Sequence, residues 1–141
     1  MKIERVESVL AGNMQIVRIF TDNGLEGIGQ SACWGYLEAS DAVVKKFSEY
    51  LVGQDPLQIE HHWQYLYRSS SFRGASIGAA LSAIDVALWD IAGKASGRPV
   101  HRLIWRSFAS TKAGAEPFRR VVPYATVYPS ARTLEELRER L

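Results

Sequence analysis

The chain has 141 residues, of which 47% are hydrophobic and 23% charged, and its formal net charge is +2. This length and balance fit one folded domain with a real core, and so small a net charge excludes a strong general attraction to nucleic acid or to membranes. The one cysteine, Cys33, excludes an intrachain disulfide and suits a reducing cytosol. The N-terminus lacks the apolar stretch of a signal peptide, and the uncharged run at residues 74–84 is too short to cross a bilayer. We therefore expect a cytoplasmic protein.

Three strands are predicted in the first 31 residues. Alternating apolar and charged residues favour a strand over residues 2–10. A second alternating segment, Gln15–Phe20, runs toward Asn23-Gly24, a strong hairpin signal. Leu25–Ser31 returns as the third strand, where Gly27 and Gly29 indicate close packing or a bulge. The pattern predicts a three-stranded antiparallel meander.

Three helices are predicted to follow. Ser40 is expected to cap the first, which ends before Gly53. Asp55 is expected to cap the second, with Pro56 at its first helical position. The third runs from Gly74–Ala75 to Gly97 and carries an apolar stripe at helical spacing, made of Ile77, Leu81, Ile84, Leu88, Ile91 and Ala95. Ala79, Ala83 and Val86 lie off this stripe. We therefore expect two partners for this helix: the meander and a second one beyond this chain.

The charges on the third predicted helix suggest architecture more than chemistry. Asp85 and Asp90 lie about 140° apart around a helix, so they cannot converge on one substrate atom. Asp90 and Lys94 form an i, i+4 pair on the far side from the stripe. We expect these residues to support the fold, and Asp85→Asn to lower stability. The adjacent His61 and His62 diverge by about 100° and lack a metal-binding spacing, so we expect no metal ligand there.

The last forty residues differ in character from the rest. Residues 102–120 contain five basic residues against Glu116 alone, with Trp105 and Phe108 among them. Basic and aromatic residues also mix in nucleic-acid-binding patches, but a linker is the favoured interpretation here. Residues 121–128 predict a buried strand, and Thr133-Leu134-Glu135-Glu136 is a capping box that opens a helix. A strand followed by a crossover helix begins a parallel sheet, so we expect a chain cut after the first βα unit of a larger α/β body.

Several stretches resemble the N-terminal capping domain of the enolase superfamily, in its mandelate racemase and muconate-lactonizing branch. They are MKI, TDNGLEGIGQ, LVGQDPLQIEHHWQYLYR, FRGASIGAALSAIDVALWDIAGKASGRPVHRLI and VVPYATVYPS. The chain departs from the family pattern at Gln30, where an acid is common. It also departs after Leu103-Ile104, where the family usually has Gly-Gly and this chain has the longer insert Trp105–Arg120.

The resemblance implies an α+β fold in three parts. Residues 1–104 would form a capping domain, with the three-stranded antiparallel meander packed on three helices. Residues 105–120 would form the basic linker. Residues 121–141 would supply the first strand and the start of the first helix of a truncated (β/α)₈ barrel.

The resemblance also implies a Mg²⁺-dependent parent enzyme that abstracts the proton α to a carboxylate. A sugar-acid dehydratase is favoured, and a racemase or a cycloisomerase is the alternative. The catalytic residues and metal ligands of the family lie on later barrel strands, and no residue here matches them, so we expect this chain to be inactive without the remaining barrel domain. We expect the parent to be a homo-oligomer without nucleic-acid or membrane partners. Two alternatives stay open. The chain could be a non-enzymatic binding or scaffold module, or it could result from a frameshift or an early stop in a longer gene.

Two loops of the family's cap contact substrate, and each has a counterpart here. The first matches Ala11–Met14, with Asn13 and Met14 as candidate substrate-binding residues. The second matches Cys33–Leu37, where Trp34 and Tyr36 offer aromatic bodies with polar tips. Arg73 is a further candidate. The alternative for all of them is packing within the cap.

Overall fold

The computed structural model describes residues 1–31, 33, 35–109, 135 and 138. It begins with an antiparallel sheet in the order β1-β2-β3, formed by β1 (Ile3–Ala11), β2 (Met14–Thr21) and β3 (Glu26–Ser31). The helices that follow in residues 35–109 are α1 (Leu37–Leu51), α2 (Ile59–Arg68), α3 (Ala75–Ser96) and α4 (Val100–Ala109). The predicted α+β fold, a three-stranded meander packed on helices, is confirmed.

The predicted barrel unit at 121–141 lies outside the described residues, apart from Glu135 and Arg138. The predicted linker at 105–120 is described only at its start. There the backbone continues α4, which runs from Val100 to Ala109 and so extends past residue 104. The division of the chain at residues 104 and 120 therefore stays a prediction.

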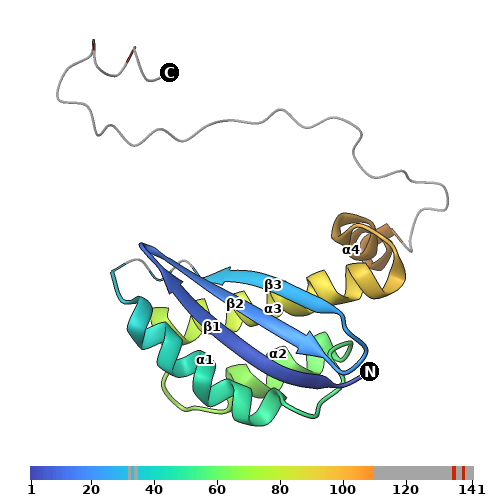
Figure 1. Ribbon diagram of the computed structural model, residues 1–141, viewed down its shortest axis with the longest axis horizontal. Coiled ribbons are helices and arrows are strands. Elements are labelled where there is room, and N and C mark those ends of the chain that lie inside the picture. Colours follow the sequence, from blue (N-terminus) through green and yellow to red (C-terminus); the bar gives the residue numbers. More distant parts are fainter. Residues whose placement is uncertain (32, 34, 110–134, 136–137, 139–141) are drawn as a thin grey trace.

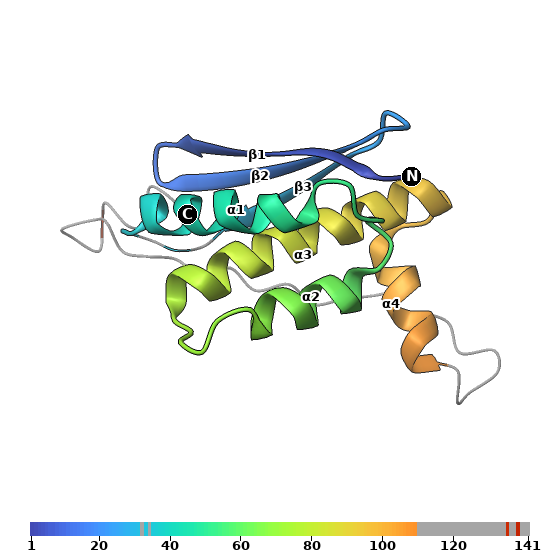
Figure 2. The same ribbon diagram turned by 90° about the horizontal axis from the view of Figure 1, so that it is seen from below.

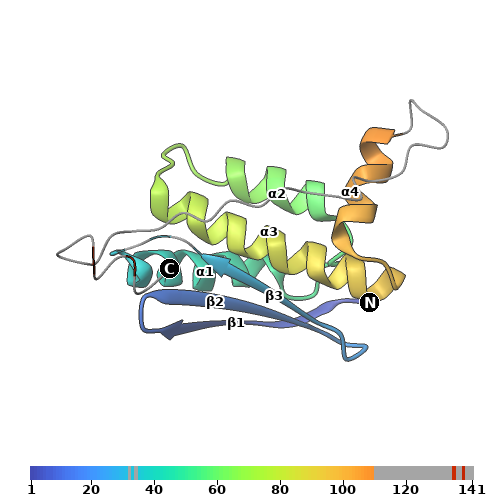
Figure 3. The ribbon, with the colours of Figure 1, turned by 90° about the horizontal axis from the view of Figure 1, so that it is seen from above.

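The helices all lie on one side of the sheet, in two layers (Figures 1 and 2). α1 and α3 pack on the sheet, α2 packs on the far side of α3, and α4 leaves the end of α3 at an angle (Figure 3). Alternation along β2 produces this one-sided burial, because Gln15, Val17, Ile19 and Thr21 are buried while the residues between them are not.

The long helix α3 is the centre of the core. Its small residues Ala83 and Ala87 are completely buried against β3, and Leu81, Ile84 and Leu88 are buried on neighbouring faces. Within this chain it packs against the sheet, against α1 and against α2. Val86, on a remaining face, is 49% exposed, so the expected partner beyond this chain stays a prediction. α3 is long and apolar enough to cross a membrane, but it is packed as the core helix of a soluble domain.

Two predicted helix starts are wrong. α1 begins at Leu37, with Tyr36 at the N-cap position, and Ser40 lies inside the helix with its hydroxyl 3.2 Å from that of Ser31. α2 begins at Ile59, because Asp55 closes a turn instead: its carboxylate accepts a hydrogen bond from the Leu57 N–H at 3.0 Å. The Ser40 hydroxyl thus meets a residue of β3 and not the start of a helix, while the Asp55 carboxylate makes a cap-like bond to a turn that the helix does not continue.

The charged pair on α3 completes the edge of the sheet. The Asp90 carboxylate accepts a hydrogen bond from the Ile28 N–H at 3.0 Å, and the Lys94 ammonium donates to the Glu26 carbonyl at 2.7 Å. The two side chains also bond to each other at 2.7 Å. They therefore occupy backbone groups of β3 that a further strand would otherwise use, which supports the structural role expected for this pair.

Candidate functional site

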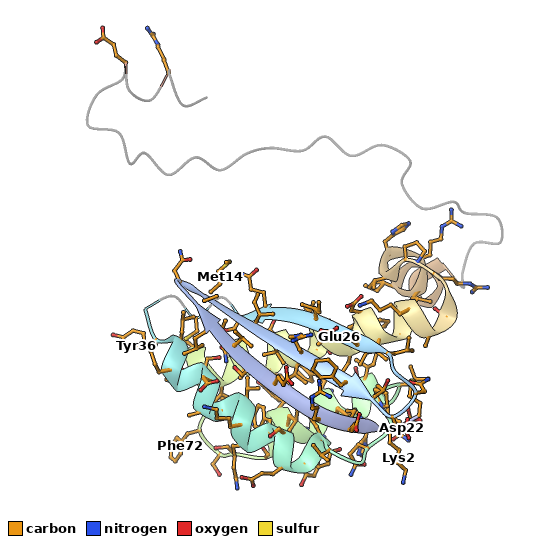
Figure 4. All side chains as sticks on the ribbon, in the orientation of Figure 1. Lys2, Met14, Asp22, Glu26, Tyr36 and Phe72 are labelled. Atoms are coloured by element: carbon orange, nitrogen blue, oxygen red, sulfur yellow. The ribbon has the colours of Figure 1, made fainter. Side chains whose placement is uncertain are left out.

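Three connections lie together at one end of the domain (Figure 4). They are the β1–β2 turn with Met14, the segment that enters α1 with Tyr36, and the α2–α3 loop with Phe72, whereas Lys2 and Asp22 lie at the opposite end. The antiparallel order of the sheet accounts for part of this arrangement, because β2 starts at the same end of the sheet at which β3 stops. We call these three connections the loop end.

The β1–β2 turn is as short as a hairpin connection can ordinarily be. Ala11 pairs with Met14, which leaves Gly12 and Asn13 as the two turn residues. Gly12 has φ +60°, a conformation that favours glycine over residues with a side chain. Asn13 is exposed, and the Met14 side chain is 42% exposed. Both predicted residues are thus accessible at the loop end.

The segment between β3 and α1 is anchored at its base and exposed at its tip. Cys33 is buried, with its Sγ 3.6 Å from the Ser76 hydroxyl on α3, and its carbonyl accepts a hydrogen bond from the Tyr36 N–H at 3.1 Å. The Tyr36 side chain is 71% exposed. Trp34, the other predicted residue, lies outside the described residues.

Arg73 belongs to the loop end but its side chain follows α2. Its Nε donates to the Tyr67 carbonyl at 2.8 Å, and its guanidinium lies 4.3 Å from the centre of the Tyr67 ring. Tyr67 in turn stacks on Trp63 at 4.7 Å. The structure therefore gives Arg73 a local partner on α2, and Asn13, Met14 and Tyr36 are the more available predicted residues.

A buried polar cluster lies beneath the loop end, and the sequence analysis did not single it out. It joins the start of β2 and the end of β3 to β1 and α1, through Ser8, Gln15, Ser31, Ser40 and Asp41. Hydrogen bonds from Lys45 and Ser8 lower the pKa of Asp41, although burial opposes the shift. The available sequence signal was a run of polar residues at inward-facing strand positions, Gln15 and Ser31 among them.

Asp85 has the opposite electrostatic environment. It lines a groove between α2, α3 and α4 together with Trp63 and Trp89. Burial, followed by the charge of Glu60, raises the pKa of Asp85, and no hydrogen bond to its carboxylate is found among the described residues. The expected loss of stability on replacing Asp85 by Asn therefore has no bonded partner to support it.

His62 has a hydrogen-bond partner at each of its ring nitrogens. It is buried, with its Nε2 2.8 Å from the Asp55 carbonyl and its Nδ1 3.0 Å from the Tyr50 hydroxyl. Because a carbonyl oxygen accepts only, Nε2 carries the proton and Nδ1 accepts from Tyr50. Neither nitrogen is left to bind a metal.

Within the part of the chain that the structure describes, no three His, Cys, Asp or Glu residues come close enough to hold a metal ion. The described residues therefore offer no set of Mg²⁺ ligands, and the ligands that the family resemblance implies belong to later barrel strands of the parent. The titratable groups of the core, Asp41, Asp85 and His62, also lie apart from one another in separate surroundings. The described residues thus provide binding surfaces without an assembled acid–base centre.

In the part of the chain that the structure describes, the fold and the loop end define a small α+β domain that exposes short loops. Residues 4–105 match the sequence profile of the mandelate racemase / muconate lactonizing enzyme N-terminal domain. The chain belongs to this family.

Relatives and solved structures agree with the family. The chain is 42% identical over 106 residues to the D-galactonate dehydratase of Variovorax paradoxus, an alignment that covers 74% of this chain and 28% of the relative. It is 45% identical over 94 residues to a D-galactonate dehydratase family member from Pseudarthrobacter chlorophenolicus, covering 65% of this chain and 23% of that protein. The chain thus spans less than a third of the length of these relatives.

Two enolase-superfamily crystal structures show the same fold. One, from Agrobacterium radiobacter with bound sodium and L-malate, superposes with a TM-score of 0.71 at 34% identity, covering 74% of this chain and 28% of that one. The other, from Pantoea ananatis with bound D-gluconate and magnesium, superposes with a TM-score of 0.70 at 34% identity, covering 73% and 26%. The three-stranded sheet with its helices is therefore the N-terminal domain fold of this superfamily.

Proposed function

We propose that this chain is the capping domain of a Mg²⁺-dependent sugar-acid dehydratase, and that its loop end faces the substrate. The observation that carries the proposal is the match of residues 4–105 to this N-terminal domain, together with relatives named D-galactonate dehydratases of which the alignment covers only 28%. The neighbouring structures with L-malate and D-gluconate support a small carboxylate as the ligand. A cytoplasmic location and a homo-oligomeric parent belong to the same proposal.

In such a parent, a base removes the proton α to the carboxylate and the neighbouring hydroxyl leaves as water. The resulting enol then becomes a 2-keto acid. Since the described residues assemble neither the base nor a metal site, this chain's share of the work is binding and exclusion of water. Asn13, Met14 and Tyr36 are the residues that we expect to touch substrate, and Trp34 and Arg73 are the further candidates.

The short β1–β2 turn supports a polar, extended substrate. With two turn residues, Gly12 and Asn13, it projects little beyond the sheet, and so leaves room for a hydroxylated chain. Tyr36 adds a phenol that can both donate and accept hydrogen bonds. A racemase or cycloisomerase parent is the second candidate, because the matching family profile bears the names of both kinds of enzyme.

The first experiment reads the gene beyond Leu141 and assays its products. We expect an open frame that encodes the barrel, and a full-length product that forms a 2-keto acid from D-galactonate only with Mg²⁺, while the 141-residue chain does not. Mg²⁺-dependent turnover by the purified 141-residue chain would contradict the proposal. Racemised acid in place of a 2-keto acid would favour the second candidate.

The second experiment tests the loop end in the full-length product. Met14→Ala and Tyr36→Phe are expected to change kcat/KM for one sugar acid relative to another by about tenfold. Val52→Ala is the matched control, because Val52 is 48% exposed but follows the opposite end of α1, and it should leave the ratio unchanged. Equal effects of all three variants would mean that the loop end does not select the substrate.

A further inference from the structure

Gln15 is a buried side chain with one unused polar atom. It faces the helices from β2, directly across from Ser31 on β3, and is 0% exposed. Among the residues that the structure describes, no group donates a hydrogen bond to its Oε1. A buried acceptor without a donor costs about 1–3 kcal/mol, so this atom points to a ligand that can donate.

The orientation of the Gln15 amide follows from its neighbours. Its Nε2 donates to the Ser8 hydroxyl oxygen at 2.8 Å. That hydroxyl donates its own hydrogen to the Asp41 carboxylate, which can only accept and is also paired with Lys45 at 2.6 Å. A flipped amide would place Oε1 against a hydroxyl whose hydrogen is already used. The carbonyl oxygen must therefore face away from Ser8.

One hydroxyl hydrogen is left over in the same cluster. The Ser31 and Ser40 hydroxyl oxygens are 3.2 Å apart and both are buried. The pair carries two hydrogens, and a single hydrogen bond between the oxygens uses one of them. The Cys33 N–H, which donates to the Ser31 oxygen at 3.4 Å, adds no acceptor. The cluster thus holds one spare donor at the serines and one spare acceptor at Gln15.

We propose that a single ordered water molecule binds between the Gln15 Oε1 and the Ser31–Ser40 hydroxyl pair. The water accepts the spare serine hydrogen and donates one of its own to Gln15, which satisfies both groups. Side chains directly opposite one another on one face of an antiparallel pair have Cβ atoms about 4.5–5.5 Å apart, and buried waters typically join such polar groups with about three hydrogen bonds.

The proposed water would connect two strand ends that lead into the loop end. Gln15 follows Met14 directly, and Ser31 is the last residue of β3 before the segment that carries Tyr36. The water would therefore tie the start of β2 to the end of β3. The water site itself does not depend on the proposed function, since it follows from the hydrogen-bond inventory of the cluster.

A double-mutant cycle on the 141-residue chain tests the link. Gln15→Met, Ser31→Ala and the double variant are unfolded in urea. If the two sites were independent, the changes that the single variants make in the unfolding equilibrium constant would multiply. The double variant should be more stable than this product predicts, with an unfolding constant at least about threefold smaller. The control pairs Gln15→Met with Ser96→Ala at the far end of α3, where Ser96 bonds to the carbonyls of its own helix; these effects should multiply without coupling.

A high-resolution crystal structure of the unaltered chain identifies the donor and does not depend on whether the variants fold. Water density within hydrogen-bond distance of both Gln15 Oε1 and a serine hydroxyl is the expected result. Density that shows Ser31 bonded directly to Gln15, or a backbone N–H of the segment between β3 and α1 on Oε1, would overturn the water site. Absence of coupling in the cycle would overturn it as well.

Discussion

Gly29→Ala is the substitution that most directly tests how β3 meets α3. A Cβ at position 29 would lie 1.9 Å from the Ala83 carbonyl oxygen and 3.0 Å from the Ala87 nitrogen, both on the α3 backbone. Real Cβ contacts rarely fall below 3.4 Å. The strand and the helix would therefore have to separate by about 1.5 Å, the difference between 3.4 Å and the 1.9 Å to the Ala83 oxygen.

Neither side can adapt by changing a rotamer, because backbone would meet backbone. Ala83 and Ala87 are already fully buried, so separation would also loosen the contacts of the neighbouring core side chains. Overpacking typically costs about 1–3 kcal/mol, and we expect Gly29→Ala to reach about 3 kcal/mol. For a domain of this size the melting temperature should then fall by about 10 °C or more.

Gly78→Ala is the matched control on the same helix. A Cβ at position 78 meets nothing within 4 Å, and alanine is favoured over glycine in a helix by about 1 kcal/mol. The same chemical change should therefore raise the melting temperature at Gly78 and lower it at Gly29. Calorimetry or thermal circular dichroism measures both. A Gly29→Ala chain as stable as the parent would refute the close-packing argument.

Three further changes test the charges. Asp90→Ala should cost about 1 kcal/mol in urea unfolding and speed hydrogen exchange at Ile28, because the β3 edge loses its acceptor; unchanged exchange would contradict this. Asp85→Asn should raise the melting temperature at pH 7, because burial and Glu60 raise the pKa of Asp85, and the gain should vanish as the pH falls below the ordinary aspartate value of about 4. Asp41→Asn should lower the melting temperature at pH 7, because the pKa of Asp41 is lowered; this loss should begin to shrink near the ordinary aspartate value of about 4 and vanish only below the lowered pKa, where the folded wild-type carboxyl is protonated. Parallel curves for wild type and variant from pH 3 to 7 would contradict either prediction.

The sequence predicted the fold where one physical signal dominated. Strand alternation placed β2 correctly. Gly27 and Gly29 predicted close packing or a bulge, and the structure shows close packing against α3. Gly97 ends α3 with φ +62°, as its position after the apolar stripe predicts. These signals are local, or repeat along a single element.

Sequence patterns predict less well where side chains bond to partners that are distant in sequence. Ser40 carried a strong capping preference, but its hydroxyl meets Ser31 across the core. The role of Asp85 depended on whether a partner faces it, which no spacing reveals. The buried polar cluster was missed for the same reason, since the pairing of Gln15 with Ser31 depends on strand register and the Ser8–Asp41 bond on how α1 lies against β1.

Two segments at the loop end, β3 and the β1–β2 turn, differ in how tightly they are packed. β3 is fixed by β2 on one side, by the α3 backbone beneath Gly29, and by Asp90 and Lys94 along its edge. The β1–β2 turn has no comparable packing, because a Cβ at Gly12 would meet nothing within 4 Å and Met14 is 42% exposed. Substitutions of Asn13 and Met14 should therefore cost little stability, whereas Gly12, with φ +60°, should not tolerate a side chain so easily. If the loop end selects substrate, Asn13 and Met14 are the positions where selectivity can change most freely, whereas changes in β3 would first disturb the fold.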